Sequence, residues 1–302
     1  MIKRVLCLIL AAVMLMALAA CNKDTNEKEK GNILDMTGPE PGDIYAEFKV
    51  LGYEQKIVFK LFPDEAPNAV EEFTTRVERG FYNGRNIHRV IPNFIIQGGS
   101  VNFDGTEGNV EFGELFGVEA SVHARNFYGA LALVADEGMF NYCQFYIVTN
   151  KNPVDINAQI EEIEELLKGD NLVRELTEEA KQRLQLNLEV MRSIPENIRE
   201  QYLTRGGAPH LDGSVSVFGQ LVSGGDVIDA IASVAVAAGN PADDEHGISS
   251  KPIEEIIIES ITIIRIPPEV DEAEVTTSAR RQSTTPTTSE SPAPPPTEED
   301  DD

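Results

Sequence analysis

Short stretches that alternate apolar and polar residues recur along the central part of the chain, from Asp43 to Ile266. Ile44–Val50 and Lys56–Leu61 show the period of two that is typical of half-buried strands. Further short strands are predicted over residues 87–91, 94–97, 129–135, 144–149, 215–222 and 256–266. Framework helices are predicted at only two places, Ala66–Arg79 and Asp226–Val234. This pattern predicts a mainly β protein whose strands close into an antiparallel barrel capped by two helices.

The segment from about residue 153 to residue 205 departs from the strand pattern. Its apolar residues recur at helical spacing, as at Ile156, Ile160, Ile163 and Leu167, and later at Leu184, Leu188 and Met191. Ser193 and Glu196 have the spacing of a capping box, which predicts the start of a third helical piece. We interpret the segment as a helical insertion between two barrel strands, packed on one flank of the barrel and without chemistry of its own.

The N-terminus has the pattern of an export signal. Two basic residues, Lys3 and Arg4, precede an uncharged apolar run from Val5 to Ala20. A permanent membrane-spanning helix is the alternative, but the run is shorter than the roughly 20 residues that a span needs. Its last residues, Leu18-Ala19-Ala20, and the following Cys21 resemble the lipobox of bacterial lipoproteins. The resemblance implies a signal peptide over residues 1–20 and a lipid on Cys21, followed by a flexible tether over residues 21–42.

The formal net charge of −26 limits the possible partners. A polyanion would be repelled by this chain, so nucleic acid is excluded as a partner. Three Cys and four His are too few and too scattered for a zinc cluster or a disulfide framework, and we expect no metal and no cofactor. Residues 267–302 are rich in Thr, Ser and Pro and end in five acidic residues, which predicts a disordered acidic tail.

Three segments carry a resemblance to a known family. The first, Phe81–Gly99, contains Asn86-Ile87-His88-Arg89-Val90 and Phe94-Ile95-Ile96-Gln97-Gly98 and strongly resembles the cyclophilin signature. Gly129–Val134 with Gln144–Val148 resembles the central strands of cyclophilins, and Pro209–Gly219 resembles their third segment. The resemblance implies one eight-stranded barrel over residues 43–266, of the bacterial lipoprotein subgroup with a helical insertion. It also implies peptidyl-prolyl cis-trans isomerase activity.

Isomerisation of a prolyl bond needs no metal, nucleophile or proton transfer. Twisting the amide breaks its resonance, which sets a barrier of about 20 kcal/mol. A catalyst therefore needs an apolar slot for the proline ring and a donor that favours the twisted amide. By resemblance, Arg89 is this donor, Phe94 forms part of the slot, and Gln97 orients the arginine and the substrate. Taken in isolation, Arg89 could instead form a surface ion pair and Phe94 could fill the barrel.

The resemblance also implies a set of substrate-binding residues. They are Ile95, Leu133, Val134, Gln144, Tyr146, His210 and Leu211. His210 stands where many relatives carry the Trp associated with tight cyclosporin binding, which reconciles a Trp-free chain with the family. Ala135 and Val215 replace polar residues of the family pattern at the edge of the groove, so activity weaker than in the best members is expected.

The predicted function is isomerisation of X-Pro bonds in exported proteins, which assists their folding outside the cytoplasm. The expected partners are proline-containing polypeptides and, through Cys21, the bacterial cell membrane; the protein itself is expected to be a monomer. The alternative is a non-catalytic proline-peptide-binding or chaperone module on the same barrel, which the changes at Ala135 and Val215 would favour.

Overall fold

The computed structural model describes residues 34, 36, 38–105, 116–135, 139, 141–168, 177–239 and 248–269. The predicted signal peptide, Cys21, most of the tether and nearly all of the acidic tail lie outside these residues. No helix within the described ranges is long and apolar enough to cross a membrane.

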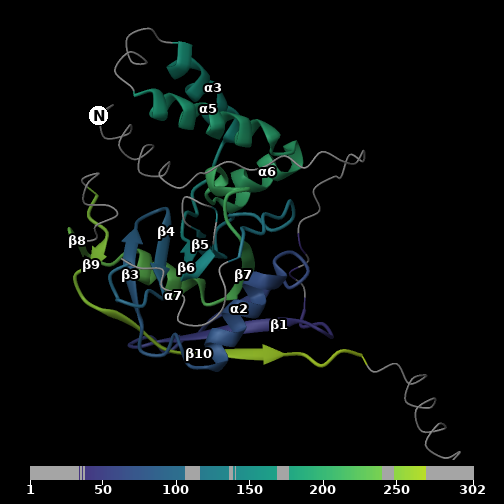
Figure 1. Cartoon of the computed structure of the whole chain (residues 1–302), viewed down its shortest axis with the longest axis vertical. Helices are drawn as coiled ribbons and strands as arrows, with labels where there is room; N and C mark the ends of the chain where they lie inside the picture. The colour runs from purple at the N-terminus through teal and green to yellow at the C-terminus, as the bar shows by residue number, and fades with distance from the viewer. Residues whose placement is uncertain are drawn as a thin grey trace, which may run out of the picture. The chain divides into compact units, whose positions relative to one another are not determined.

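Eight strands form a closed barrel, as the sequence predicts (Figure 1). Around the barrel their order is β1-β10-β3-β4-β6-β5-β7-β2, and every neighbouring pair is antiparallel. The strands are β1 (Ile44–Val50), β2 (Ile57–Leu61), β3 (Asn86–Ile91), β4 (Ile95–Gly98), β5 (Ala130–Ala135), β6 (Asn141–Val148), β7 (Val217–Ser223) and β10 (Ile256–Arg265). A short hairpin, β8 (Val236–Ala237) with β9 (Lys251–Pro252), lies outside the barrel and has no counterpart in the sequence prediction.

The two predicted framework helices are α2 (Pro67–Glu78) and α7 (Gly225–Ala232). The N-terminus of α2 has no cap of its own, and the carboxylate of Glu119 accepts hydrogen bonds from the backbone of Asn68 and Ala69 instead. The helix ends at Glu78, and the φ of 71° at Gly80 allows the backbone of Phe81 to donate to the carbonyl of Arg76. The predicted boundaries of both helices are therefore close to those of the structure.

Alternation along the strands separates two apolar clusters. One fills the barrel interior and includes Phe48, Phe73, Phe145 and Phe218, with the rings of Phe73 and Phe218 4.9 Å apart. The other, which we call the outer cluster, lies on the opposite face of β4, β5, β6 and β7; its buried members are Phe62, Ile95, Ala124, Ala130, Ala132, Tyr146, Val148, Ala208, Leu211, Val215 and Val217. An apolar outer face on a barrel needs a cover or a ligand.

Part of the predicted tether belongs to that cover. Leu34 and Met36 are half-buried against the outer cluster, and the backbone of Gly42 donates to Ile266 at the end of the barrel. The tether is thus anchored on the barrel before β1 begins, which differs from the expectation of a free linker up to residue 42.

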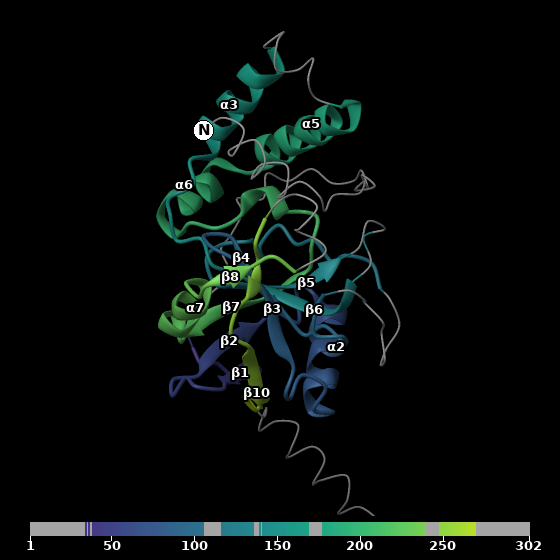
Figure 2. The ribbon, with the colours of Figure 1, turned by 90° about the vertical axis from the view of Figure 1, so that its left-hand side faces the viewer.

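Within its described residues, 153–168 and 177–205, the insertion forms the helices α3 (Ile156–Lys168), α5 (Glu178–Ser193) and α6 (Glu196–Arg205), which the short turn η1 (Pro209–Leu211) follows. Figures 1 and 2 both show α3 and α5 side by side, with α6 between them and the barrel. Their apolar faces form a third cluster, which also holds Phe127 of the segment before β5. The insertion therefore has a small apolar core of its own, and Phe127 connects this core to the barrel.

One local prediction in the insertion is wrong. Ser193 does not cap α6, because it is the last residue of α5 and its hydroxyl donates to the carbonyl of Val190. Pro195 occupies the position before α6, and its side chain offers no acceptor. Ser193 belongs to the last turn of α5, so its hydroxyl bonds to a carbonyl of that helix and does not cap α6.

Candidate active site

Strand register places three of the predicted site residues on one face. Arg89 of β3 lies opposite Gln97 of β4, and Gln97 lies opposite Tyr146 of β6. Directly opposed residues of neighbouring strands point to the same side of a sheet. Ile95, two residues before Gln97, shares that face and belongs to the outer cluster. Residues that are distant in the chain are thereby brought together on the outside of the barrel.

The polar residues on this face form a chain of hydrogen bonds. Nη1 of Arg89 donates to Oε1 of Gln97 at 3.0 Å, and Nε2 of Gln97 donates to Oε1 of Gln144 at 2.8 Å. Nε2 of Gln144 then donates to the backbone carbonyl of Gly105 at 3.2 Å. A guanidinium can only donate, so each amide in the chain has a single orientation. Because Arg89 is 9% exposed, the chain fixes a cation at the edge of the apolar face.

The apolar wall beside this chain is formed by strands and by the η1 turn. The ring of Phe94 stacks on the imidazole of His210, with centroids 5.4 Å apart. Ile95, Tyr146 and Leu211 are buried in the outer cluster, and Phe94 and Val134 are half-buried against it. A half-buried aromatic ring beside buried aliphatic side chains can receive an apolar ring such as that of proline.

His210 is electrically neutral in this wall. Burial lowers the pKa of its imidazole to about 4. Its Nε2 has no hydrogen-bond partner among the described residues. His210 therefore contributes a flat ring to the wall and no charge near neutral pH.

Leu133 is a correction to the predicted set. Its side chain is fully buried in the cluster that fills the barrel interior, opposite Phe145 on β6. Residues of β5 alternate between the two faces, so Val134 borders the site while Leu133 points the other way. Leu133 supports the wall from inside the barrel and does not face the substrate side.

Two positions that depart from the family pattern, Val215 and Ala135, are both buried, and of the two Val215 lies in the wall. Val215 is 6% exposed and belongs to the outer cluster, and Ala135 is 5% exposed at the end of β5. Neither side chain can donate or accept a hydrogen bond. The site thus keeps its apolar wall and the Arg89 chain but has no polar side chain at Val215.

The sequence does not point to two groups that complete the site. Asn126 is fully buried, and its Oδ1 accepts a hydrogen bond from the Tyr146 hydroxyl at 2.8 Å. This bond turns the hydroxyl away from the apolar face, so Tyr146 presents only its ring there. The backbone carbonyl of Gly105 ends the polar chain. In the sequence, Asn126 is recognisable only as a polar residue between two predicted strands. The backbone carbonyl of Gly105 cannot be recognised from the sequence at all.

The arrangement is suited to stabilising a twisted amide. A permanent cation that is held by its neighbours costs little reorganisation when it donates to a carbonyl or to a pyramidal nitrogen. No group of three or more His, Cys, Asp and Glu side chains that could hold a metal ion occurs among the described residues. The Arg89 chain supplies hydrogen bonding at this site, and the wall supplies apolar binding.

Comparison with known proteins agrees with this geometry. The model of the family described as cyclophilin type peptidyl-prolyl cis-trans isomerase/CLD matches residues 45–193 and 193–263. Relatives from Staphylococcus epidermidis and Staphylococcus haemolyticus, both named as peptidyl-prolyl cis-trans isomerases, are 34% identical over 219 residues. The alignments cover 72% of this chain and 92% and 91% of the two relatives.

Among solved structures, this chain matches a cyclophilin type peptidyl-prolyl cis-trans isomerase of Cryptosporidium parvum. The match has a TM-score of 0.48 and 19% identity, and covers 74% of this chain and 98% of the other. On the family match over most of the barrel and the identity to the curated relatives, this chain belongs to the cyclophilin-type peptidyl-prolyl cis-trans isomerase family.

Proposed function

We propose that this cyclophilin isomerises X-Pro bonds of polypeptides outside the cytoplasm, while a lipid on Cys21 holds it at the membrane. The observation that supports the catalytic part is the hydrogen-bonded chain from Arg89 through Gln97 to Gln144, beside the stacked rings of Phe94 and His210. This hydrogen-bonded chain positions a cation next to an apolar wall. A cationic donor and an apolar wall are the two elements that the reaction needs.

In the proposed reaction Arg89 acts on the amide and the wall acts on the ring. The planar amide delocalises the nitrogen lone pair, so that nitrogen accepts hydrogen bonds only once the bond has twisted. A donor fixed at that position binds the twisted state more tightly than either planar isomer and lowers the barrier. Gln97 holds the guanidinium in place, and Phe94 with Leu211 holds the proline ring against rotation with the rest of the peptide.

The proposed location follows from the sequence before the barrel. The basic residues, the apolar run and the lipobox-like Leu18–Cys21 occur in the order of a lipoprotein signal. Each buried methylene of an acyl chain contributes about 0.8 kcal/mol, so more than one chain on Cys21 gives stable attachment. Newly exported polypeptides are unfolded, and their X-Pro bonds isomerise slowly without a catalyst.

The catalytic proposal is tested with Arg89→Ala on a peptide that contains Ala-Pro. The expected result is acceleration by the wild type and a loss of at least about 100-fold in kcat/KM in the variant. Arg265→Ala is the matched control, because Arg265 is exposed and pairs with Glu78 at the far end of β10. Equal rates for wild type and Arg89→Ala, both at the uncatalysed level, would refute catalysis. Peptide binding without acceleration would instead favour the non-catalytic module.

The membrane proposal is tested by Cys21→Ser in a bacterium that processes lipoproteins. The wild type is expected in the membrane fraction with an incorporated labelled fatty acid, and the variant is expected to lose the label and the membrane association. Incorporation of the label into Cys21→Ser, or unlabelled wild type, would refute lipidation at this residue.

A further inference from the structure

A buried polar network joins the insertion to the wall of the proposed proline pocket. We call it the Asp212 network; its members are Arg125, Asn126, Tyr146, Tyr202 and Asp212. Asp212 directly follows the η1 turn, Tyr202 lies on α6 of the insertion, and Tyr146 lies on β6 of the barrel. The insertion and the turn that follows it therefore meet at the Asp212 carboxylate, and Asn126 connects this carboxylate to β6 of the barrel.

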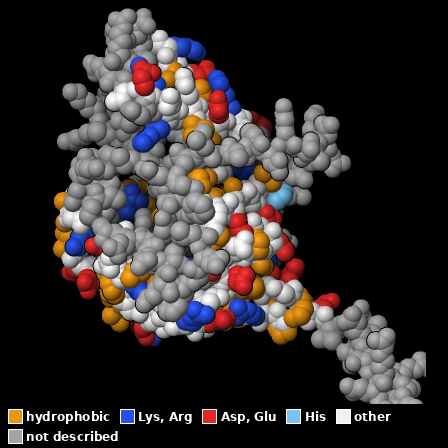
Figure 3. Space-filling view, in the orientation of Figure 1, with side chains coloured by type: hydrophobic (Ala, Val, Ile, Leu, Met, Phe, Trp, Pro, Cys, Tyr) orange, Lys and Arg blue, Asp and Glu red, His pale blue; other side chains and the backbone are white. Residues whose placement is uncertain are grey.

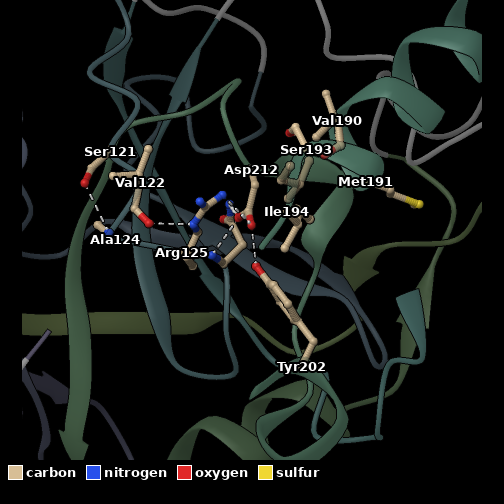
Figure 4. Close-up of polar contacts among 12 residues, drawn as sticks. Ser121, Val122, Ala124, Arg125, Val190, Met191, Ser193, Ile194, Tyr202 and Asp212 are labelled. Atoms are coloured by element: carbon tan, nitrogen blue, oxygen red, sulfur yellow. Dashed lines mark hydrogen bonds and ion pairs between the residues drawn. The ribbon is translucent and has the colours of Figure 1, made fainter. Parts of the chain in front are cut away.

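Asp212 accepts four hydrogen bonds although its side chain is almost fully buried. Its Oδ1 accepts from the backbone and side-chain nitrogens of Asn126 at 3.0 and 2.9 Å. Its Oδ2 accepts from the Tyr202 hydroxyl at 2.7 Å and from Nη1 of Arg125 at 3.3 Å. Figure 4 shows the Tyr202 hydroxyl pointing at the carboxylate, with Arg125 close to it. A buried carboxylate with all its acceptor sites in use resists displacement.

The network continues from Asp212 to the substrate side. Asn126 donates from Nδ2 to Asp212 and accepts at Oδ1 from the Tyr146 hydroxyl, so one amide connects the two residues. The η1 turn is tied to the same place, because the backbone of Ala208 donates to the carbonyl of Asn126 at 2.8 Å. That turn carries His210 and Leu211 of the wall.

On the insertion side, Tyr202 is held by several contacts at once. It is 0% exposed, its ring packs against Phe127 with centroids 4.5 Å apart, and its carbonyl accepts from the backbone of Val154. Gly206 and Gly207 lead directly back to the barrel, since a Cβ on Gly207 would lie 2.3 Å from the carbonyl oxygen of Asn126. The hydroxyl of Tyr202 is thus the polar link from α6 to Asp212.

We propose that Tyr202 is a positioning residue through which the insertion holds His210, Leu211 and Tyr146 in the shape that binds proline. Removal of its hydroxyl leaves Oδ2 of Asp212 with Arg125 as its remaining donor in the network, which loosens the η1 turn and the wall that it carries. Arg89 and its partners Gln97 and Gln144 lie outside the network, so the step on the bound peptide is left intact. The inference rests on the proposed function, since it concerns the same site.

The test separates peptide binding from isomerisation of the bound peptide. Both measurements use the full mature chain. NMR titration gives the affinity for an Ala-Pro peptide, and exchange spectroscopy gives the rate at which the bound peptide isomerises, which we call the rate on the protein. Tyr202→Phe is expected to weaken binding about fivefold while the rate on the protein changes less than about twofold. Tyr128→Phe is the matched control, because it removes a hydroxyl that donates to the carboxylate of Asp229 at 2.9 Å away from the wall. The control is expected to match the wild type in both measurements.

A second variant covers loss of folding. If Tyr202→Phe is unfolded by circular dichroism, Tyr146→Phe breaks the network at its other end, keeps the ring in the wall, and is expected to weaken binding to a similar extent. Unchanged affinity in the folded variants, or an equal loss in Tyr128→Phe, would overturn the inference. A wild type that binds peptide without acceleration would refute the proposed catalysis alone, because the effect of Tyr202→Phe is judged by affinity.

Discussion

The ring of Phe94 and the imidazole of His210 stack with an angle of 26° between their planes. Phe94 lies in the β3–β4 connection, and His210 comes from the turn that closes the insertion. The contact therefore joins the segment that carries Arg89 and Gln97 to the turn that follows the insertion. On the face that Figure 3 shows, acidic and basic side chains are interspersed among the described residues.

The first prediction concerns the pH dependence of stability through His210. Burial lowers the pKa of its imidazole to about 4 from an ordinary 6.5, so between these pH values the unfolded chain binds a proton that the folded chain does not. Stability is therefore lost through this residue as the pH falls from about 6.5 to about 4, by up to about 3 kcal/mol. In urea unfolding, His210→Gln is expected to lose less stability over this range than the wild type. Parallel curves of stability against pH for the two proteins would contradict the assigned cause.

The second prediction concerns the hydrogen-bonded chain that holds Arg89. Gln97→Ala removes the acceptor of Arg89 and the donor to Gln144 at once, so the guanidinium is no longer held in one position. A hydrogen bond to a charged group contributes about 1.5–3 kcal/mol, and kcat/KM in a peptide isomerisation assay is expected to fall at least about tenfold.

The matched control for this variant is Gln220→Ala on β7. The Gln220 amide donates to the backbone carbonyl of Tyr128 at 2.7 Å, on a strand that does not carry the Arg89 chain. Isomerisation by this control is expected at the wild-type rate. Equal activity of Gln97→Ala and Gln220→Ala in the same peptide assay would show that the chain does not position Arg89.

Patterns of short range predict most of the fold. The alternation in Ile44–Val50 matches the bounds of β1, because a strand with one buried face must repeat every two residues. The same rule explains the misplacement of Leu133: adjacent residues of β5 face opposite sides, and a family resemblance gives no side for either. The β8–β9 hairpin escapes such patterns since two-residue strands carry no measurable period.

The polar part of the site is only half predictable from the sequence. Arg89 and Gln97 lie in one short segment, and their pairing follows from a hairpin register. The link of Tyr202 to Asp212 depends on how the insertion packs against the barrel, and the link of Asn126 to Tyr146 joins the segment before β5 to β6; no local pattern specifies either contact. Burial of both partners, and not their spacing, determines such bonds.

The last prediction concerns the return of the chain from the insertion to the barrel at Gly207. The φ of Gly207 is +129°, and a Cβ there would lie 2.3 Å from the carbonyl oxygen of Asn126, which itself accepts from Ala208. Gly207→Ala therefore combines backbone strain with a clash against backbone that cannot move without breaking that bond. Gly52→Ala isolates the strain alone, since Gly52 has a φ of +86° and no atom of the described residues lies within 4 Å of the place that an added methyl group would take. Unfolding in urea is expected to show a loss of about 1–2 kcal/mol for Gly52→Ala and of more than about 4 kcal/mol for Gly207→Ala. Similar losses in the two variants would mean that the insertion can shift away from Asn126 at little cost, and that its contact with the barrel is not rigid.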